Sequence, residues 1–346
     1  MDLNLNTDRL YKDDGLNWYP FSKGRGALYC YLKEIKKENP SKIEVIIPAV
    51  TCIAVVQMIH CLGLKAVFVD LEEGNLNLDP ILLEAKLGPL TLAIIHHAFS
   101  GHIPEKLYTS KDCYNILDLA QGDLLSYDLP ESIDMAFMSC HWNKQIAFGL
   151  GSLMTTRKSF EFKLGAKENP WFKWTSILIR FLKKINCYQH LFRLTRYIKD
   201  SDEELLPTDS FTPLSLTNHQ YTSLLEYINK LKRSDLSHII DYLKRNRVIY
   251  FKSSSDLGEV KIILLGKNKP LIVKSGVKKN VFLYLWPRTN LSPCKNLEEW
   301  GYRAEEFPRA TRFVEEAVTI VFNSKRSINK NFEFIRKNLN EFKRYE

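Results

Sequence analysis

The stretch Met138-Ser139-Cys140-His141-Trp142-Asn143-Lys144 places a lysine a few residues beyond a short apolar run, Met135 to Ser139. A short apolar run without charges is typical of a strand that is buried on both faces of a sheet. We therefore expect Lys144 on the loop that leaves the carboxyl end of this strand. Ligands of open α/β sheets bind at such ends.

Similar runs rich in valine and isoleucine recur through the first half of the chain, and helical patterns separate several of them. This alternation predicts an α/β fold with a mostly parallel sheet flanked by helices. The expected strands are residues 43–47, 66–70, 92–96, 114–117, 135–139 and 152–156, and the expected helices are residues 28–37, 51–62 and 80–86.

From about residue 216 the alternation of strand-like and helical segments gives way to longer helical segments. We expect helices at residues 216–231, 234–251 and 310–317, strands at residues 260–265 and 280–286, and a terminal amphipathic helix marked by Phe332 and Phe342. The sequence thus predicts a large cofactor-binding α/β domain over residues 1–232 and a smaller C-terminal α+β domain over residues 233–346.

The net charge of +9 in 346 residues is concentrated between Arg157 and Lys199, where eleven basic residues face two acidic ones. Residues 174–199 combine this charge with an amphipathic helical pattern. Such a segment is compatible with a solvated surface helix, or with a contact to a membrane surface or a partner. Nucleic acid is not expected, because the chain carries no recognised binding motif.

The seven cysteines are scattered and form no C-x-x-C pair, which indicates reduced thiols and no metal site. The chain begins without the basic and apolar regions of a signal peptide, and no apolar stretch approaches the roughly 18 residues of a membrane-spanning helix. These features predict a soluble cytoplasmic protein.

Lys144, Asp118, Gln121 and Ser139 together supply the groups that hold pyridoxal phosphate. A lysine with a lowered pKa can act as a nucleophile and carry the cofactor covalently. A carboxylate can pair with the ring nitrogen and keep it protonated. The same residues also allow a plainer interpretation, with Lys144 as a solvated lysine and Asp118 as a turn former.

The chain resembles the DegT/StrS-type sugar aminotransferases, which are fold-type-I pyridoxal phosphate enzymes, over most of its length. The resemblance rests on blocks that occur in the family's order and close to its spacing. These blocks are residues 24–28, 45–52, 66–70, 76–79, 93–97, 116–121 and 139–151.

The resemblance implies a role for each matched position. Lys144 matches the lysine that carries the cofactor, and Asp118 matches the residue that pairs with the pyridine nitrogen. Gln121 matches the amide that contacts the ring hydroxyl, and Ser139 matches a hydroxyl that binds the phosphate. The remaining expected cofactor-binding residues are Gly24 and Arg25, at the start of a predicted helix, and Cys52.

Four features of the sequence depart from the family's pattern. Cys52 stands where the family usually has an aromatic ring, and Arg25 stands where it has a threonine. The carboxylate that follows the lysine in the family is absent from Gly149-Leu150-Gly151-Ser152. The segment Pro213 to Leu216 lacks the family's asparagine-tyrosine-arginine sequence, which reaches the phosphate of the partner subunit.

The resemblance implies a homodimeric enzyme that moves an amino group from an amino acid, with glutamate as the expected donor, to a nucleotide-linked keto sugar. The product would enter polysaccharide or glycosylated metabolite biosynthesis. The departures leave open an alternative, a catalytically weakened or non-catalytic family member that acts as a binding or regulatory subunit. A sugar dehydratase of the type that replaces the lysine by histidine is disfavoured by Lys144.

Overall fold

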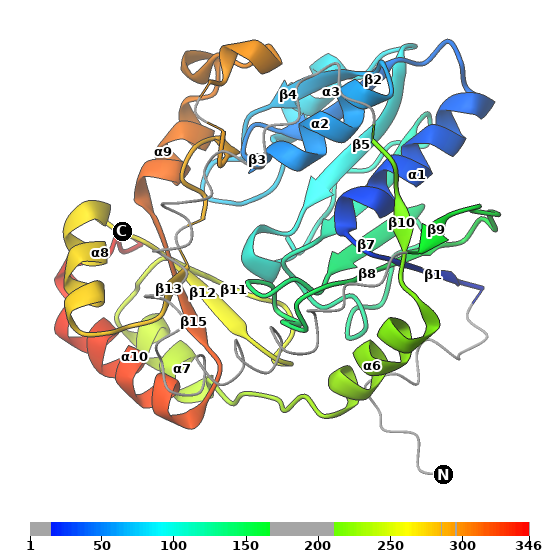
Figure 1. The fold of residues 1–346 in the computed structure, drawn as a ribbon. Helices are drawn as coiled ribbons and strands as arrows, with labels where there is room; N and C mark the ends of the chain where they lie inside the picture. Colours follow the sequence, from blue (N-terminus) through cyan, green and yellow to red (C-terminus); the bar gives the residue numbers. More distant parts are fainter. Residues whose placement is uncertain (1–14, 167–210, 285, 295, 346) are drawn as a thin grey trace.

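In the computed structural model, residues 15–166, 211–284, 286–294 and 296–345 are described. Seven strands of this part form one sheet in the order β1-β8-β7-β6-β5-β2-β4 (Figure 1). Strands β4, β2, β5, β6 and β7 run parallel, whereas β8 and β1 continue the sheet in antiparallel pairs. The bounds are β1 Asn17–Phe21, β2 Glu44–Pro48, β4 Lys65–Val69, β5 Thr91–His97, β6 Tyr114–Leu119, β7 Met135–Ser139 and β8 Ser152–Thr156.

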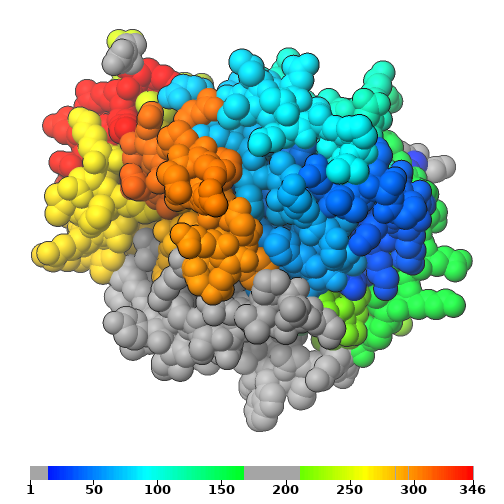
Figure 2. Space-filling view, turned by 90° about the horizontal axis from the view of Figure 1, so that it is seen from above, coloured from blue at the N-terminus to red at the C-terminus, as the bar shows by residue number. Residues whose placement is uncertain are grey.

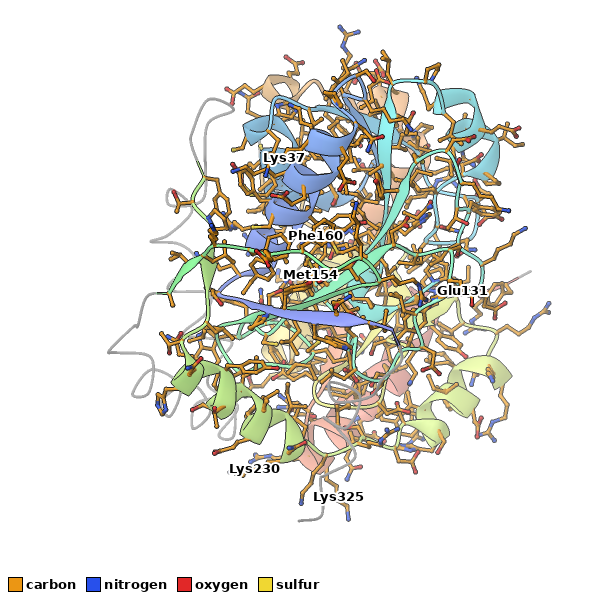
Figure 3. The ribbon with its side chains drawn as sticks, turned by 90° about the vertical axis from the view of Figure 1, so that its right-hand side faces the viewer. Lys37, Glu131, Met154, Phe160, Lys230 and Lys325 are labelled. Atoms are coloured by element: carbon orange, nitrogen blue, oxygen red, sulfur yellow. The ribbon has the colours of Figure 1, made fainter. Side chains whose placement is uncertain are left out.

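Helices cover both faces of this sheet, as strands without charged residues in their centres require. Figure 3 views the edge strand β1, with α1 (Gly24–Glu38) on one side of the sheet and α6 (Asn218–Asn229) on the other. Helix α2 (Ile53–Cys61) shares a core with α1, and α3 (Pro80–Lys86) packs on the opposite face against β2, β4 and β5. Alternate residues of β7 therefore enter different cores, with Phe137 on the α1 side and Met138 on the α6 side.

A second, antiparallel sheet is formed by the C-terminal part in the order β11-β12-β15-β13. Three helices cover one of its faces, through a core that contains Ile239, Ile272 and Phe334. The bounds are β11 Tyr250–Lys252, β12 Val260–Leu265, β15 Ala317–Phe322, β13 Leu283–Tyr284, α7 Ser237–Arg245, α8 Lys269–Lys278 and α10 Lys325–Lys337.

The chain between β13 and β15 lies against the large sheet. Figure 2 shows this segment, coloured orange, between the yellow and red C-terminal part and the blue N-terminal part. Its strand β14 (Leu291–Ser292) pairs with β3 (Thr51–Cys52), and the Tyr302 hydroxyl donates a hydrogen bond of 2.8 Å to the carbonyl oxygen of Ala49. Residues of this segment and of the second sheet are thus part of the core under α1 and α2.

Smaller elements complete the described chain. Strands β9 (Gly165–Ala166) and β10 (Leu214–Ser215) pair with each other, and helix α9 (Pro308–Glu316) precedes β15 directly. Short 3-10 turns occupy Phe99–Gly101, Glu298–Trp300, Ala304–Glu306 and Leu339–Glu341.

The predicted fold class is confirmed: a mostly parallel sheet between helices is followed by a smaller C-terminal α+β part. The expected helix over residues 234–251 is partly wrong, because α7 ends at Arg245 and β11 follows. Arg247 has a φ of 56°, in the left-handed region, which turns the chain out of the helix. The expected helix from Thr51 begins only at Ile53, because Thr51 and Cys52 pair with β14.

Other expectations lie beyond what this structure describes. The amphipathic segment 174–199 falls within residues 167–210, which are outside the described part, and the boundary at residue 232 stays a prediction. Among the described helices, none combines the length and apolar character needed to span a bilayer.

Asp70, one residue beyond β4, joins the two parts of the protein. The carboxylate is buried, accepts hydrogen bonds from the backbone N–H groups of Arg309 (3.1 Å) and Ala310 (2.7 Å), and lies 3.5 Å from Nε of Arg309. It therefore satisfies the otherwise unpaired N-terminal groups of α9 and compensates the helix dipole. Arg309 also pairs with Asp79 at 2.7 Å.

We expect Asp70→Ala to lower the free energy of unfolding by about 3 kcal/mol, because it leaves the N–H groups of Arg309 and Ala310 without their acceptor and removes one of the two carboxylates that pair with Arg309. Urea denaturation measures this loss. Asp112→Ala, at an exposed aspartate, is the control and should change stability by less than about 0.5 kcal/mol. Equal losses in both variants would contradict a specific role for Asp70.

Candidate functional site

Polar side chains gather at the carboxyl ends of three neighbouring parallel strands. His97 ends β5, Asp118 lies near the end of β6, and Ser139 ends β7. The register pairs His97 with Asp118 and Asp118 with Phe137, and Ser139 lies two residues beyond Phe137. Side chains two residues apart point to the same face, so all three face the side covered by α1. They are buried, with exposures of 5%, 2% and 8%.

The Asp118 carboxylate is buried without a protein cation against it. Its Oδ1 accepts a 2.8 Å hydrogen bond from the N–H of Ala120, which fixes the side chain at the start of a turn. Among the described residues, Asp118 forms no ion pair within 4.0 Å. A buried carboxylate is costly unless a partner stabilises its charge, so this site favours a cationic group from a ligand.

Lys144 lies on a closed loop between β7 and β8. The loop is fastened at its base by hydrogen bonds from Cys140 N–H to the Gly151 carbonyl (2.8 Å) and from Gly149 N–H to the Cys140 carbonyl (2.6 Å). Gly149 has a φ of 116°, and a Cβ there would come within 2.1 Å of the Trp142 ring, so only glycine fits. Lys144 itself is partly exposed.

Three other predicted residues lie around Cys52, which directly precedes α2. Burial raises the pKa of the Cys52 thiol, while the charges of Lys144 and Arg25 act to lower it and that of Asp118 acts to raise it. These three charged side chains therefore lie within electrostatic reach of one thiol. The structure brings Arg25, Cys52, Asp118 and Lys144 to one site, although they are far apart in sequence.

Gly24 and Ser139 form a second part of the same site. A Cβ placed on Gly24 would lie 3.5 Å from Cβ of Ser139, so the first turn of α1 and the end of β7 are adjacent. Lys23, which precedes α1, makes no side-chain capping bond to the helix. The positive end of the helix dipole, together with the Ser139 hydroxyl, suits an anion such as a phosphate.

Gln121 lies in the turn after β6 and is 2% exposed. Its Oε1 is buried and has no hydrogen-bond partner among the described residues. Buried polar atoms normally have partners, so a ligand hydroxyl would satisfy this one. Gln121 is linked to the site by its position in the turn three residues after Asp118.

His97 belongs to the site but was not predicted as a site residue. Its ring stacks on Phe99 at 4.7 Å, and Nδ1 lies 3.4 Å from the Thr51 hydroxyl. Burial lowers the pKa of His97, Asp118 acts to raise it and Lys144 acts to lower it. Two signals could have identified this residue: the alternation of side chains between the two faces of β5, and the pairing of β5 with β6.

The segment that replaces the family's asparagine-tyrosine-arginine sequence lies beside α1. The Leu214 carbonyl accepts a 2.8 Å hydrogen bond from the Ser22 N–H, and a Cβ on Gly26 would lie 3.7 Å from Cβ of Pro213. This segment thus packs on the chain that leads into α1 and offers no arginine there. Among the described residues, no group of three histidine, cysteine or acidic side chains could hold a metal ion.

The family model of the DegT/DnrJ/EryC1/StrS aminotransferases matches residues 21–159, which contain every predicted site residue. Over this stretch the chain is similar to that family. The resemblance predicted from the sequence is thereby confirmed, and the match ends before the region that departs most from the family's pattern.

Similar proteins include a sugar aminotransferase and two solved structures. A UDP-2-acetamido-2-deoxy-3-oxo-D-glucuronate aminotransferase of Pseudomonas aeruginosa is 34% identical over 102 residues, which span 28% of each chain. A Streptococcus pneumoniae protein, named as a sugar aminotransferase and solved in its PLP form, has a TM-score of 0.63 at 15% identity, over 96% of this chain and 89% of that one. A GDP-4-keto-6-deoxymannose-3-dehydratase variant with bound GDP-perosamine has a TM-score of 0.64 at 14% identity, over 96% of this chain and 90% of that one. At these identities the structural matches establish the fold.

His96, the neighbour of His97, points to the opposite face of the sheet and gives the protein a measurable pH dependence. It is 2% exposed, neither ring nitrogen has a hydrogen-bond partner among the described residues, and burial lowers its pKa to about 4. Unfolding restores the usual value near 6.5, so between these two pH values the unfolded chain binds more protons. Stability from this group is therefore full above pH 6.5 and is lost as the pH falls toward 4.

We expect His96→Leu to flatten the fall in unfolding free energy between pH 7 and pH 4 by up to about 3 kcal/mol, because leucine has no proton to bind. Urea denaturation across this pH range measures the slope. His219→Gln, at an exposed position of α6, is the control and should keep the wild-type slope. A His96→Leu profile parallel to wild type would refute the assignment.

Proposed function

We propose that this protein is a pyridoxal phosphate-dependent aminotransferase that moves an amino group from an amino acid, with glutamate as the donor, to a nucleotide-linked keto sugar. The observation that carries this proposal is the buried Asp118 carboxylate, which has no protein cation in ion-pair distance among the described residues and shares its site with Lys144. A protonated ring nitrogen supplies the missing charge, and the lysine supplies the amine.

The residues present fit the cofactor. Gly24, Ser139 and the first turn of α1 would hold its phosphate, with Arg25 adding a positive charge. Gln121 would donate to or accept from the ring hydroxyl, and Cys52 would lie against the ring. When bound, pyridoxal phosphate supplies a carbonyl carbon that an amine can attack and a protonated ring that accepts electron density.

Each reacting group of the chain has one task. The Asp118 carboxylate keeps the ring nitrogen protonated, and its hydrogen bond from Ala120 N–H holds it in place. The Lys144 amine would hold the cofactor covalently, and it would be the base that takes the proton from Cα of the donor amino acid. His97 lies beside Asp118 on the neighbouring strand and completes the apolar wall with Phe99.

The substrate class is supported by the names of the similar proteins. The Pseudomonas relative acts on a UDP-linked sugar with an oxo group, and the dehydratase structure holds a GDP-linked amino sugar. We propose a nucleotide-linked keto sugar on this basis, and a role in polysaccharide or glycosylated metabolite biosynthesis. Lys144 favours amino transfer over the histidine-dependent type of dehydration. We also propose a homodimer, as the family resemblance implies.

The alternative is a weakened or non-catalytic family member that binds without turnover. The thiol at Cys52 favours it, because a thiol gives up most of the stacking that an aromatic ring provides. The absence of an arginine in the Pro213–Leu216 segment points the same way. Amino transfer from glutamate to a panel of UDP-, GDP- and dTDP-linked keto sugars, followed as 2-oxoglutarate formation, separates the two functions.

We expect borohydride reduction in the presence of pyridoxal phosphate to attach the cofactor to the peptide that contains Lys144. Lys144→Ala should abolish this label and the visible absorbance of the bound cofactor, because it removes the amine that would hold the cofactor. Mass spectrometry of the peptides and an absorbance spectrum measure both effects. Lys158→Ala, at an exposed lysine that pairs with Glu38, is the control and should label normally. Undiminished labelling of Lys144→Ala would remove the basis of the proposal.

We expect Cys52→Phe to tighten cofactor binding by roughly tenfold, because an aromatic contact adds about 0.5–1.5 kcal/mol beyond the area it buries. Titration of the apoprotein with pyridoxal phosphate, followed by absorbance, measures the affinity. Cys113→Phe, at another partly buried cysteine, is the control and should not tighten binding. Weaker binding by Cys52→Phe would indicate that the cofactor ring does not lie against this residue.

A further inference from the structure

The segment Ser255 to Lys261, which leads into β12 of the second sheet, lies against the lysine loop of the first. The Gln145 side chain donates hydrogen bonds from Nε2 to the carbonyl oxygens of Ser255 (2.9 Å) and Leu257 (3.0 Å). In return, the Glu259 N–H donates a 2.9 Å hydrogen bond to the Gln145 carbonyl. These hydrogen bonds therefore join the short segment to Gln145, the residue that directly follows Lys144.

Close packing accompanies these hydrogen bonds. Gly258 has a φ of 73°, and a Cβ there would come within 2.4 Å of the Gln145 carbonyl oxygen. Glycine is therefore needed for both its backbone conformation and its lack of a side chain. The backbone of the segment is therefore in direct contact with the backbone of the loop.

Lys261 holds the other side of Lys144. This lysine is 1% exposed, and its Nζ donates a 3.0 Å hydrogen bond to the Asn143 carbonyl and lies 4.6 Å from the centre of the Tyr284 ring. Lys261 alternates with Val260 and Ile262, which enter the core under α7 and α10, so its side chain leaves the opposite face of the second sheet. A buried ammonium makes strong, charge-assisted hydrogen bonds, and here the acceptor is the carbonyl bonded to the nitrogen of Lys144.

We propose that Lys261 is a positioning residue that, with the segment Ser255–Glu259, fixes the backbone on both sides of Lys144. The carbonyls of Asn143 and Gln145, the residues before and after Lys144, are both bound by the C-terminal part. The base of the loop is fastened to the large sheet, whereas its tip is held by the second sheet. The orientation of the Lys144 amine therefore depends on both parts of the protein. The effect of Lys261 on catalysis rests on the proposed function. The hydrogen bonds that fix the loop do not depend on it.

Hydrogen exchange of the loop peptide, residues 140–149, tests the proposal on the full-length protein without cofactor. We expect Lys261→Met to speed exchange in this peptide about tenfold and Lys261→Arg to restore protection, because arginine keeps a charged donor. The matched control is Lys269→Met. Lys269 is a partly buried lysine whose Nζ also donates to two carbonyls, those of Pro287 (3.2 Å) and Val314 (2.6 Å), away from the loop.

The control distinguishes a local effect on the loop from a general loss of stability. Lys269→Met should leave exchange of the loop unchanged even where it lowers the midpoint of thermal unfolding. Equal exchange of the loop in wild type and Lys261→Met, or equal acceleration by the two methionine variants, would overturn the proposal. Gly258→Ala provides a second variant, and it should also speed exchange of the loop because its Cβ displaces the Gln145 carbonyl.

A second readout connects the loop to the Lys144 amine. We expect the rate of borohydride-trapped labelling of Lys144 by pyridoxal phosphate to fall about tenfold in Lys261→Met and to recover in Lys261→Arg. Lys269→Met serves as the control for a lowered midpoint of thermal unfolding. Absence of labelling in wild type would refute the proposed function and leave the exchange result as the test of the hold. Normal labelling in Lys261→Met would show that Lys261 does not position the amine.

Discussion

The site depends on one constraint, a buried carboxylate, Asp118, which has no ion-pair partner among the residues that the structure describes. Asp118 is held by β6 and by the N–H of Ala120, so it cannot turn toward solvent to regain hydration. The parallel strands on either side then decide which groups surround it, since their carboxyl ends meet at one edge of the sheet. His97 comes from β5, Ser139 from β7, and Lys144 from the loop that β7 leads into. The groups that surround the site thus follow from strand register, and the buried Asp118 carboxylate lies among them.

Much of the large sheet could be predicted because its strands are short, apolar and separated by helical patterns. Strands β7 and β8 and helix α3 have the bounds that the sequence indicated. Strand β1 was missed because Pro20 is unfavourable within a sheet, and it is tolerated here at an edge. Helix α8 was missed because Gly276 interrupts its pattern; that glycine allows Leu283 to pack closely. Strand β15 follows α9 without a break, and a short apolar run there is compatible with either structure.

The site could be predicted as far as local motifs reach. Lys144, Asp118 and Ser139 stand in sequence blocks that resemble the family's, and the structure brings them to one edge of the sheet. His97 required the register of two strands, which a single sequence does not contain. Lys261 required a contact between residues 118 positions apart, and its spacing from Lys144 follows no local rule. Interactions between the two sheets were therefore the part that sequence patterns could not provide.

The orange segment in Figure 2 has a consequence for how the protein is made. Trp286, Leu291 and Tyr302 complete the core under α1 and α2, and β3 finds its partner only in β14. A ribosome releases these residues after the strands of the large sheet have emerged. Until then the nascent chain carries an open apolar face beside the future site. This face is buried only once the segment that contains Trp286, Leu291 and Tyr302 has been synthesised and has packed on it.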